Sequence, residues 1–206
     1  MAGFSLKAVA LFPFVALIGA GSPAGPAVFD ADGKMHFPAD YRQWTYVTTG
    51  HGMSYNPVAN AAADAPFDTV FANPEAYAAF RKTGHWPEGT VLALEIRRGQ
   101  SKGSINVAGA FQTGEALGVE VHIKDTARFG TSQDGWAFFG FDPANPAPAA
   151  KVPETANCYA CHRDHAAVDR TFVQFYPTLL PVAKAKGSLS AAYLKDEADR
   201  AAAPTP

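Results

Sequence analysis

The stretch Leu117-Gly118-Val119-Glu120-Val121-His122-Ile123-Lys124 decides the fold class, because apolar and polar residues alternate along it. Successive side chains of a β-strand point to opposite faces of the sheet. The two valines and Ile123 therefore share one face, and Glu120 and His122 share the other. This pattern predicts a strand with one face in the hydrophobic core.

Other segments of the sequence predict further strands and a few helices. Asn73, Pro74 and Gly84 are typical of a helix N-cap, first turn and end, which predicts a helix over residues 74–82. Two further helices are expected at 156–162 and 189–201. Together the segments predict a single α+β domain dominated by an antiparallel sheet. The further strands are expected at residues 44–49, 67–71, 90–97, 104–112 and 136–141.

The only two cysteines lie in Cys158-Tyr159-Ala160-Cys161-His162. C-x-x-C-H is the pattern of covalent c-type haem attachment. On one helical turn both thiols can form thioethers with a haem, and His162 can be the proximal iron ligand. The motif predicts one covalently bound haem c and makes the helix that carries it the haem-binding helix.

Other interpretations of the same five residues are weaker. A redox-active dithiol would need a thioredoxin-like βαβ setting, which the pattern of elements does not provide. A structural zinc site would need four ligands, with His165 as the fourth, and all four would lie on one helix. A disulfide between Cys158 and Cys161 would close a very small loop and add little stability.

The N-terminal segment predicts export. Residues 1–27 contain one charge, Lys7, then an apolar run and a stretch of small residues, as in a secretory signal peptide. An uncleaved membrane anchor is the alternative. Covalent haem attachment in bacteria takes place outside the cytoplasmic membrane, so the expected location is the periplasm. The predicted haem domain then spans residues 28–200, followed by a disordered tail at 201–206.

Composition and motif order exclude several protein classes. The formal net charge is −2 and no lysine or arginine cluster is present, so nucleic acid is not an expected partner. Small electron-transfer cytochromes c carry the motif near the N-terminus with an axial methionine after it, whereas no methionine follows His162 here. The period-two segments exclude the four-helix bundle of the helical c-prime cytochromes.

Several runs of the sequence occur in a characteristic order: residues 37–44, 77–84, 86–90, 119–125, 135–141 and then the haem motif. In the order of these runs the chain resembles the cytochrome P-460 family, which includes the c-prime-beta cytochromes. The resemblance implies a sheet-rich fold, a haem near the C-terminus, a five-coordinate iron with one open face, and usually a homodimer.

The same resemblance implies two kinds of chemistry. In a hydroxylamine-oxidising branch a lysine is cross-linked to the haem and a distal carboxylate assists proton transfer. In a gas-binding branch phenylalanines cap the iron and the cross-link is absent. Lys82 is the candidate for the cross-link, with an ordinary solvated lysine at a helix end as the alternative. No Asp or Glu lies between Glu95 and Glu115, which departs from the hydroxylamine-oxidising pattern.

The residues of the distal side are expected among several candidates. Glu95 is the candidate proton-transfer carboxylate, whereas Glu120 is expected on the solvated face of the sheet. Met53 or Tyr55, from the loop before the second strand, could cap the iron, and Met53 could bind it. Further candidate sixth ligands are His51, His85 and His122, and further candidate capping residues are Phe71, Phe80 and Phe111.

These observations predict a periplasmic mono-haem cytochrome with an open distal site. It would bind or oxidise small nitrogen species such as hydroxylamine or nitric oxide, and would pass electrons to an acceptor protein. Two alternatives stay open at this point. One is a six-coordinate electron carrier, and the other is a gas-binding protein without turnover.

Overall fold

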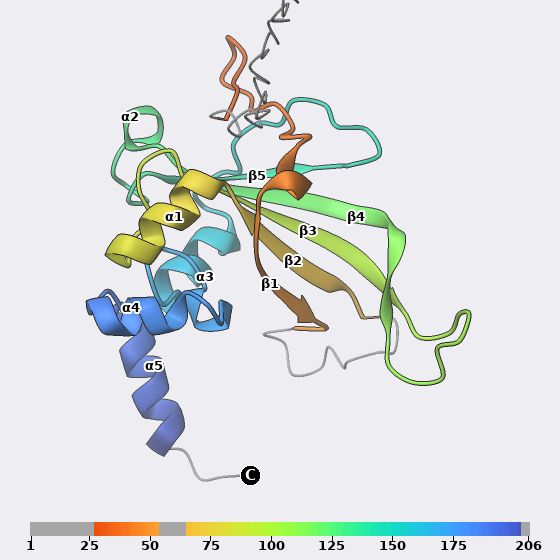
Figure 1. The fold of residues 1–206 in the computed structure, drawn as a ribbon. Coiled ribbons are helices and arrows are strands. Elements are labelled where there is room, and N and C mark those ends of the chain that lie inside the picture. Colours follow the sequence, from red (N-terminus) through yellow and green to blue (C-terminus); the bar gives the residue numbers. More distant parts are fainter. Residues whose placement is uncertain (1–26, 54–64, 203–206) are drawn as a thin grey trace, which may run out of the picture.

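The computed structural model describes residues 27–53 and 65–202, and its centre is a five-stranded sheet (Figure 1). The strands follow one another in the order β1-β2-β3-β4-β5, and every neighbouring pair is antiparallel. The α+β fold predicted from the sequence is confirmed. The strands are β1 (Thr45–His51), β2 (Phe67–Ala72), β3 (Val91–Gln100), β4 (Phe111–Lys124) and β5 (Trp136–Phe141).

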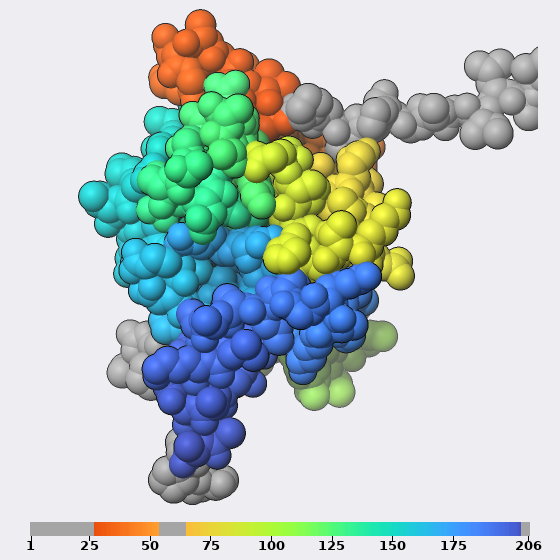
Figure 2. Space-filling model, turned by 90° about the vertical axis from the view of Figure 1, so that its left-hand side faces the viewer, coloured from red at the N-terminus to blue at the C-terminus, as the bar shows by residue number. Residues whose placement is uncertain are grey.

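The longer helices gather on one side of this sheet, and α1 and α4 pack against each other there (Figures 1 and 2). α1 ends where Gly84 adopts the left-handed conformation (φ 80°), which glycine reaches without strain. None of the helices in the described ranges is long and apolar enough to cross a membrane. The helices are η1 (Tyr41–Gln43), α1 (Pro74–Thr83), α2 (Thr126–Phe129), α3 (Asn157–His165), η2 (Val173–Phe175), α4 (Leu180–Lys186) and α5 (Ala191–Ala202).

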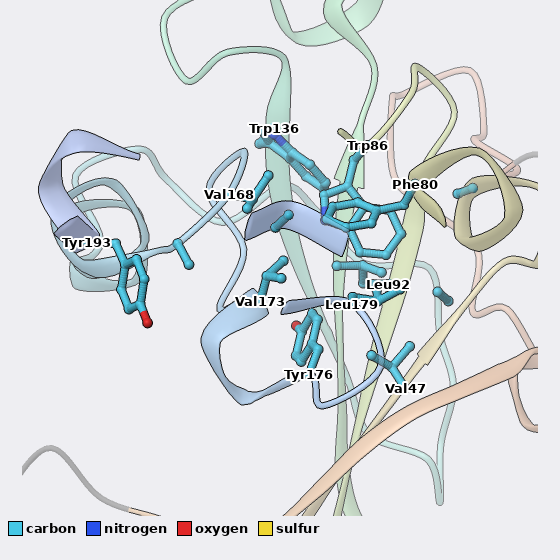
Figure 3. Packing of buried hydrophobic residues seen from close by; sticks show 14 residues of the cluster. Val47, Phe80, Trp86, Leu92, Trp136, Val168, Val173, Tyr176, Leu179 and Tyr193 are labelled. Atoms are coloured by element: carbon cyan, nitrogen blue, oxygen red, sulfur yellow. The ribbon is translucent and has the colours of Figure 1, made fainter. Parts of the chain in front are cut away.

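Each face of the sheet buries its own hydrophobic core. Between the sheet and the helices lie Trp86, Phe80 and Trp136, together with residues that follow α3 (Figure 3). On the opposite face Phe139 of β5 packs with Tyr41, Trp44 and other residues of the segment before β1. The alternation of β4 divides its side chains between these faces as predicted. Val119, Val121 and Ile123 belong to the second core, and the polar residues point toward the helices.

One predicted strand is wrong in part, and one predicted helix cap differs in its side-chain contact. Residues 104–110 form turns rather than a strand, since Asn106 donates side-chain hydrogen bonds to the carbonyls of Ser101 and Gly109 and closes a loop. Asn73 is the N-cap residue of α1, as predicted, but its side chain makes no capping hydrogen bond. Its side-chain oxygen accepts a hydrogen bond from the Val91 N–H (2.8 Å) and so joins the helix start to β3.

Candidate functional site

The C-x-x-C-H motif lies on α3, as the sequence predicted. Positions three and four apart on a helix are neighbours on one face, so Cys158, Cys161 and His162 face the same side. Both cysteines are free thiols and half-buried. The helix therefore presents two thiols and one imidazole together.

The ring of His162 is held in one tautomer. Its Nδ1 lies 2.6 Å from the carbonyl oxygen of Arg170. A carbonyl can only accept, so Nδ1 carries the proton and donates it, which leaves Nε2 with a free lone pair. Burial lowers the pKa of His162, which favours the neutral imidazole that binds metals.

His162 lines a cavity of about 410 Å³ between the sheet and the segment after α3. A volume of this size is within the range of small-molecule and cofactor sites. Cys161 lines an adjoining groove between α3 and α5, and Phe175 lines both spaces. Most of the cavity wall is apolar or aromatic, from residues Val70, Leu92, Leu94, Phe138, Phe172, Phe175 and Tyr176.

A second histidine lies beside the first. The ring of His122 is stacked on Phe138 with centroids 4.0 Å apart, and its centroid lies 5.0 Å from that of His162. Burial lowers the pKa of His122 well below its ordinary value. Its Nε2 is buried without a hydrogen-bond partner among the described residues. His122 therefore lines the cavity next to His162.

Among the described residues, the carboxylates that line the cavity are Glu120 and Asp68. They lie on β4 and β2, on either side of β3. Burial raises the pKa of both groups, and the charge of Asp68 raises that of Glu120 further. Glu120 precedes His122 by two residues, so it lies on the same face about 7 Å along the strand. Glu120 is exposed, as expected for a residue on the solvated face of the sheet, and it also lines the cavity.

Two predicted catalytic residues do not lie in the cavity. Glu95 lies on the opposite face of the sheet, where it is 4% exposed and accepts hydrogen bonds from Tyr41, Arg42 and Arg97. Lys82 is exposed near the end of α1 and is not part of the cavity wall. Among the described residues, no lysine lines the cavity.

Of the two predicted capping residues, Met53 lines the cavity, while Tyr55 lies outside the described residues. The other candidate histidines are engaged elsewhere. His51 stacks on Phe67, His85 donates to Asp169, and His165 pairs with Asp196. The candidate phenylalanines Phe71, Phe80 and Phe111 do not line the cavity either.

The segment Thr171–Tyr176 supplies part of the cavity wall and was not predicted. Phe172 packs against His162 with ring centroids 4.3 Å apart, and Phe175 and Tyr176 also line the cavity. The aromatic residues directly after the haem motif are the signal that could have indicated this wall.

A family model described as Cytochrome P460 matches residues 38–173, which is more than half of the chain. The chain belongs to the cytochrome P460 family. The resemblance inferred from the sequence is therefore confirmed, and membership implies that the protein is a haem-binding cytochrome. A comparison with curated proteins found no match.

The residues of this cytochrome P460 family member fit a haem. The donor set is an imidazole with a free Nε2 and two thiols on the same helix face. The cavity beside it has the flat aromatic and aliphatic lining that a large apolar macrocycle requires. Cys158 and Cys161 would hold the macrocycle, and His162 would ligate its iron.

Proposed function

We propose that the protein is a periplasmic mono-haem c-type cytochrome whose cavity admits small nitrogen species, with nitric oxide as the best-supported ligand. When bound, the haem supplies an iron coordination position and one-electron chemistry. The observation that carries the proposal is the hydrogen bond from His162 Nδ1 to Arg170, because it leaves Nε2 for a metal at the wall of a 410 Å³ cavity.

The chain's own residues divide the remaining tasks. His162 would hold the metal, and Leu92, Leu94 and Phe138 would surround the group with apolar side chains. Glu120 holds a proton more readily than an ordinary glutamate, because burial raises its pKa. A small polar ligand entering the cavity would therefore meet a mostly apolar wall with two carboxyl groups, Glu120 and Asp68.

The cavity supports ligand binding more than hydroxylamine oxidation. The resemblance implies a haem-linked lysine for the oxidising branch, and Lys82 does not line the cavity. Oxidation of hydroxylamine, with Glu120 as proton acceptor, is the alternative within the same site. A steady-state assay with hydroxylamine and an electron acceptor separates the two, since turnover supports the enzyme and its absence supports the binding protein.

A six-coordinate electron carrier would need a second axial ligand, for which Met53 and His122 are the predicted candidates that line the cavity. Met53 lines the cavity but packs on the end of β1, where a Cβ added to Gly50 would come within 2.5 Å of its sulfur. We expect ferrous protein to bind one nitric oxide per haem, and the Met53→Ala variant to have the same resting spectrum. A changed resting spectrum in this variant would support the carrier instead.

Replacing Glu120 by glutamine is expected to reduce the pH dependence of the haem midpoint potential. Reduction removes one positive charge from the site and raises the pKa of nearby acids, so proton uptake by Glu120 makes the potential fall as pH rises. The slope for one proton per electron is at most about 59 mV per pH unit. Spectroelectrochemical titration measures this slope of the midpoint potential against pH.

The control is Glu115→Gln, which lies on the same strand outside the cavity and should keep the wild-type slope. Equal slopes in both variants would contradict a role for Glu120.

The location and partners belong to the same proposal. The N-terminal segment, residues 1–27, supports export to the periplasm, although residues 1–26 lie outside the described ranges. The family resemblance supports a homodimer. One-electron chemistry calls for an electron-acceptor protein as redox partner.

A further inference from the structure

The carbonyl that holds His162 belongs to a turn of unusual backbone conformation. Asp169 and Arg170 both have positive φ, 45° and 60°. Non-glycine residues seldom adopt this left-handed region, and two in succession are less frequent still. Val168 and Thr171 close the turn with backbone hydrogen bonds. The direction of the Arg170 carbonyl therefore depends on a conformation that the chain does not favour by itself.

The Asp169 carboxylate ties the turn to the loop after α1. Oδ2 accepts a hydrogen bond from the backbone N–H of Trp86 (2.8 Å), and Oδ1 accepts one from Nδ1 of His85 (3.1 Å). Trp86 is 1% exposed and belongs to the core between sheet and helices. The turn is thus attached to a buried residue of the hydrophobic core.

Two further contacts fix the other residues of the turn. Nε of Arg170 donates to the carboxylate of Asp134 (2.7 Å), which itself has a positive φ of 53°. Nε1 of Trp86 donates to the hydroxyl of Thr171 (2.9 Å), and that hydroxyl donates to the carbonyl of Val168. The side chains of Arg170 and Thr171, which flank the Arg170 carbonyl, are therefore both held by hydrogen bonds.

We propose that Asp169 is a positioning residue that sets the strength of the bond between His162 and the haem iron, by holding the Arg170 carbonyl against Nδ1 of His162. A hydrogen bond from Nδ1 makes the imidazole a stronger electron donor to the metal. Loss of the turn weakens this hydrogen bond, and the iron becomes easier to reduce. The inference rests on the proposed haem ligation by His162.

The test compares four variants of the haem-loaded protein. Asp169→Ala and Asp169→Gly both remove the carboxylate, but glycine adopts positive φ without cost. Asp169→Asn keeps an oxygen that can accept from Trp86, and asparagine tolerates the left-handed region. Asp199→Asn alters an exposed carboxylate on α5 that pairs with Lys195, and serves as the matched control.

The readouts are the iron–histidine stretching frequency of the ferrous protein in resonance Raman spectra, and the midpoint potential. We expect the alanine and glycine variants to have a lower frequency and a higher potential than the wild type. The asparagine variant should lie close to the wild type, and the Asp199 variant should be identical to it. A glycine variant with wild-type frequency and potential would overturn the inference, because folding of the turn is not impeded in that variant.

Failure of the proposed function has a different result. If His162→Gly keeps the same iron–histidine band, then His162 is not the ligand, and both the function and the inference are wrong. If His162→Gly loses the band but the Asp169→Gly variant is unchanged, only the positioning role is contradicted.

Discussion

Protein in which alanine replaces both Cys158 and Cys161 is expected to lose its covalently attached haem completely. The two thiols are the only cysteines of the chain, and they lie with His162 on one face of α3. Without them the haem could be held only by the cavity and by iron ligation. The measurement is haem staining of the denatured protein, or its intact mass, after expression with haem-ligation machinery.

Single replacements of the same cysteines provide the matched controls. Each single variant keeps one thiol, so a single thioether should still retain haem after denaturation, in lower yield. Haem that stays attached to the double variant under denaturing conditions would contradict attachment through the motif. Wild-type protein that releases all its haem on denaturation would contradict it equally.

Glu95→Ala is expected to lower the free energy of unfolding by about 3–5 kcal/mol, because it leaves Arg97 as an unpaired charge within the protein. Glu95 is buried, whereas the Arg97 side chain is 15% exposed. Tyr41, fully buried, would lose its hydrogen-bond acceptor as well. Urea unfolding measures the change. The haem spectrum should stay that of the wild type, because this cluster is on the face away from the cavity.

The same residue predicts an acid dependence. Burial alone would raise the pKa of Glu95, but hydrogen bonds from Arg97, Tyr41 and Arg42 outweigh it and leave the pKa lowered. A carboxyl whose pKa is lower in the folded state contributes stability at pH values above its unfolded pKa, and this contribution is lost as pH falls through the folded pKa. Glu95→Gln should therefore lose less stability on acidification than the wild type. Equal losses would contradict the ion cluster.

The sequence predicted those elements whose signal is local. The alternation of β4, the strand at β5 and the Pro74 and Gly84 signals around α1 depend on neighbouring residues, and the structure has them all. The haem motif likewise depends on a spacing within one helical turn. These features could be predicted without knowing which residues pack against them.

The sequence could not show which face of the sheet carries the site. Alternation places Glu95 and Glu120 each on one face of its own strand, but the register between strands decides which face that is. Leu94 pairs with Glu120, so Glu95 pairs with Val119 and points into the opposite core. Because of this register, the candidate proton-transfer carboxylate of the cavity is Glu120 and not Glu95.

The predicted strand at residues 104–112 failed for a related reason. Ile105 and Val107 alternate with polar residues, but they are 94% and 99% exposed, because no strand in the described ranges packs on the loop. Alternation indicates where side chains would point in a strand and does not indicate whether a partner exists. The hydrogen bond from His162 to the Arg170 carbonyl could not be predicted either. Its acceptor is a backbone carbonyl, and no sequence pattern marks such an acceptor.

The absorption spectrum of the purified ferrous protein tests the central claim most directly, because it reports whether the haem iron has an open coordination position. A high-spin, five-coordinate spectrum that changes on addition of nitric oxide is the predicted result. A low-spin, six-coordinate spectrum that nitric oxide leaves unchanged would contradict it.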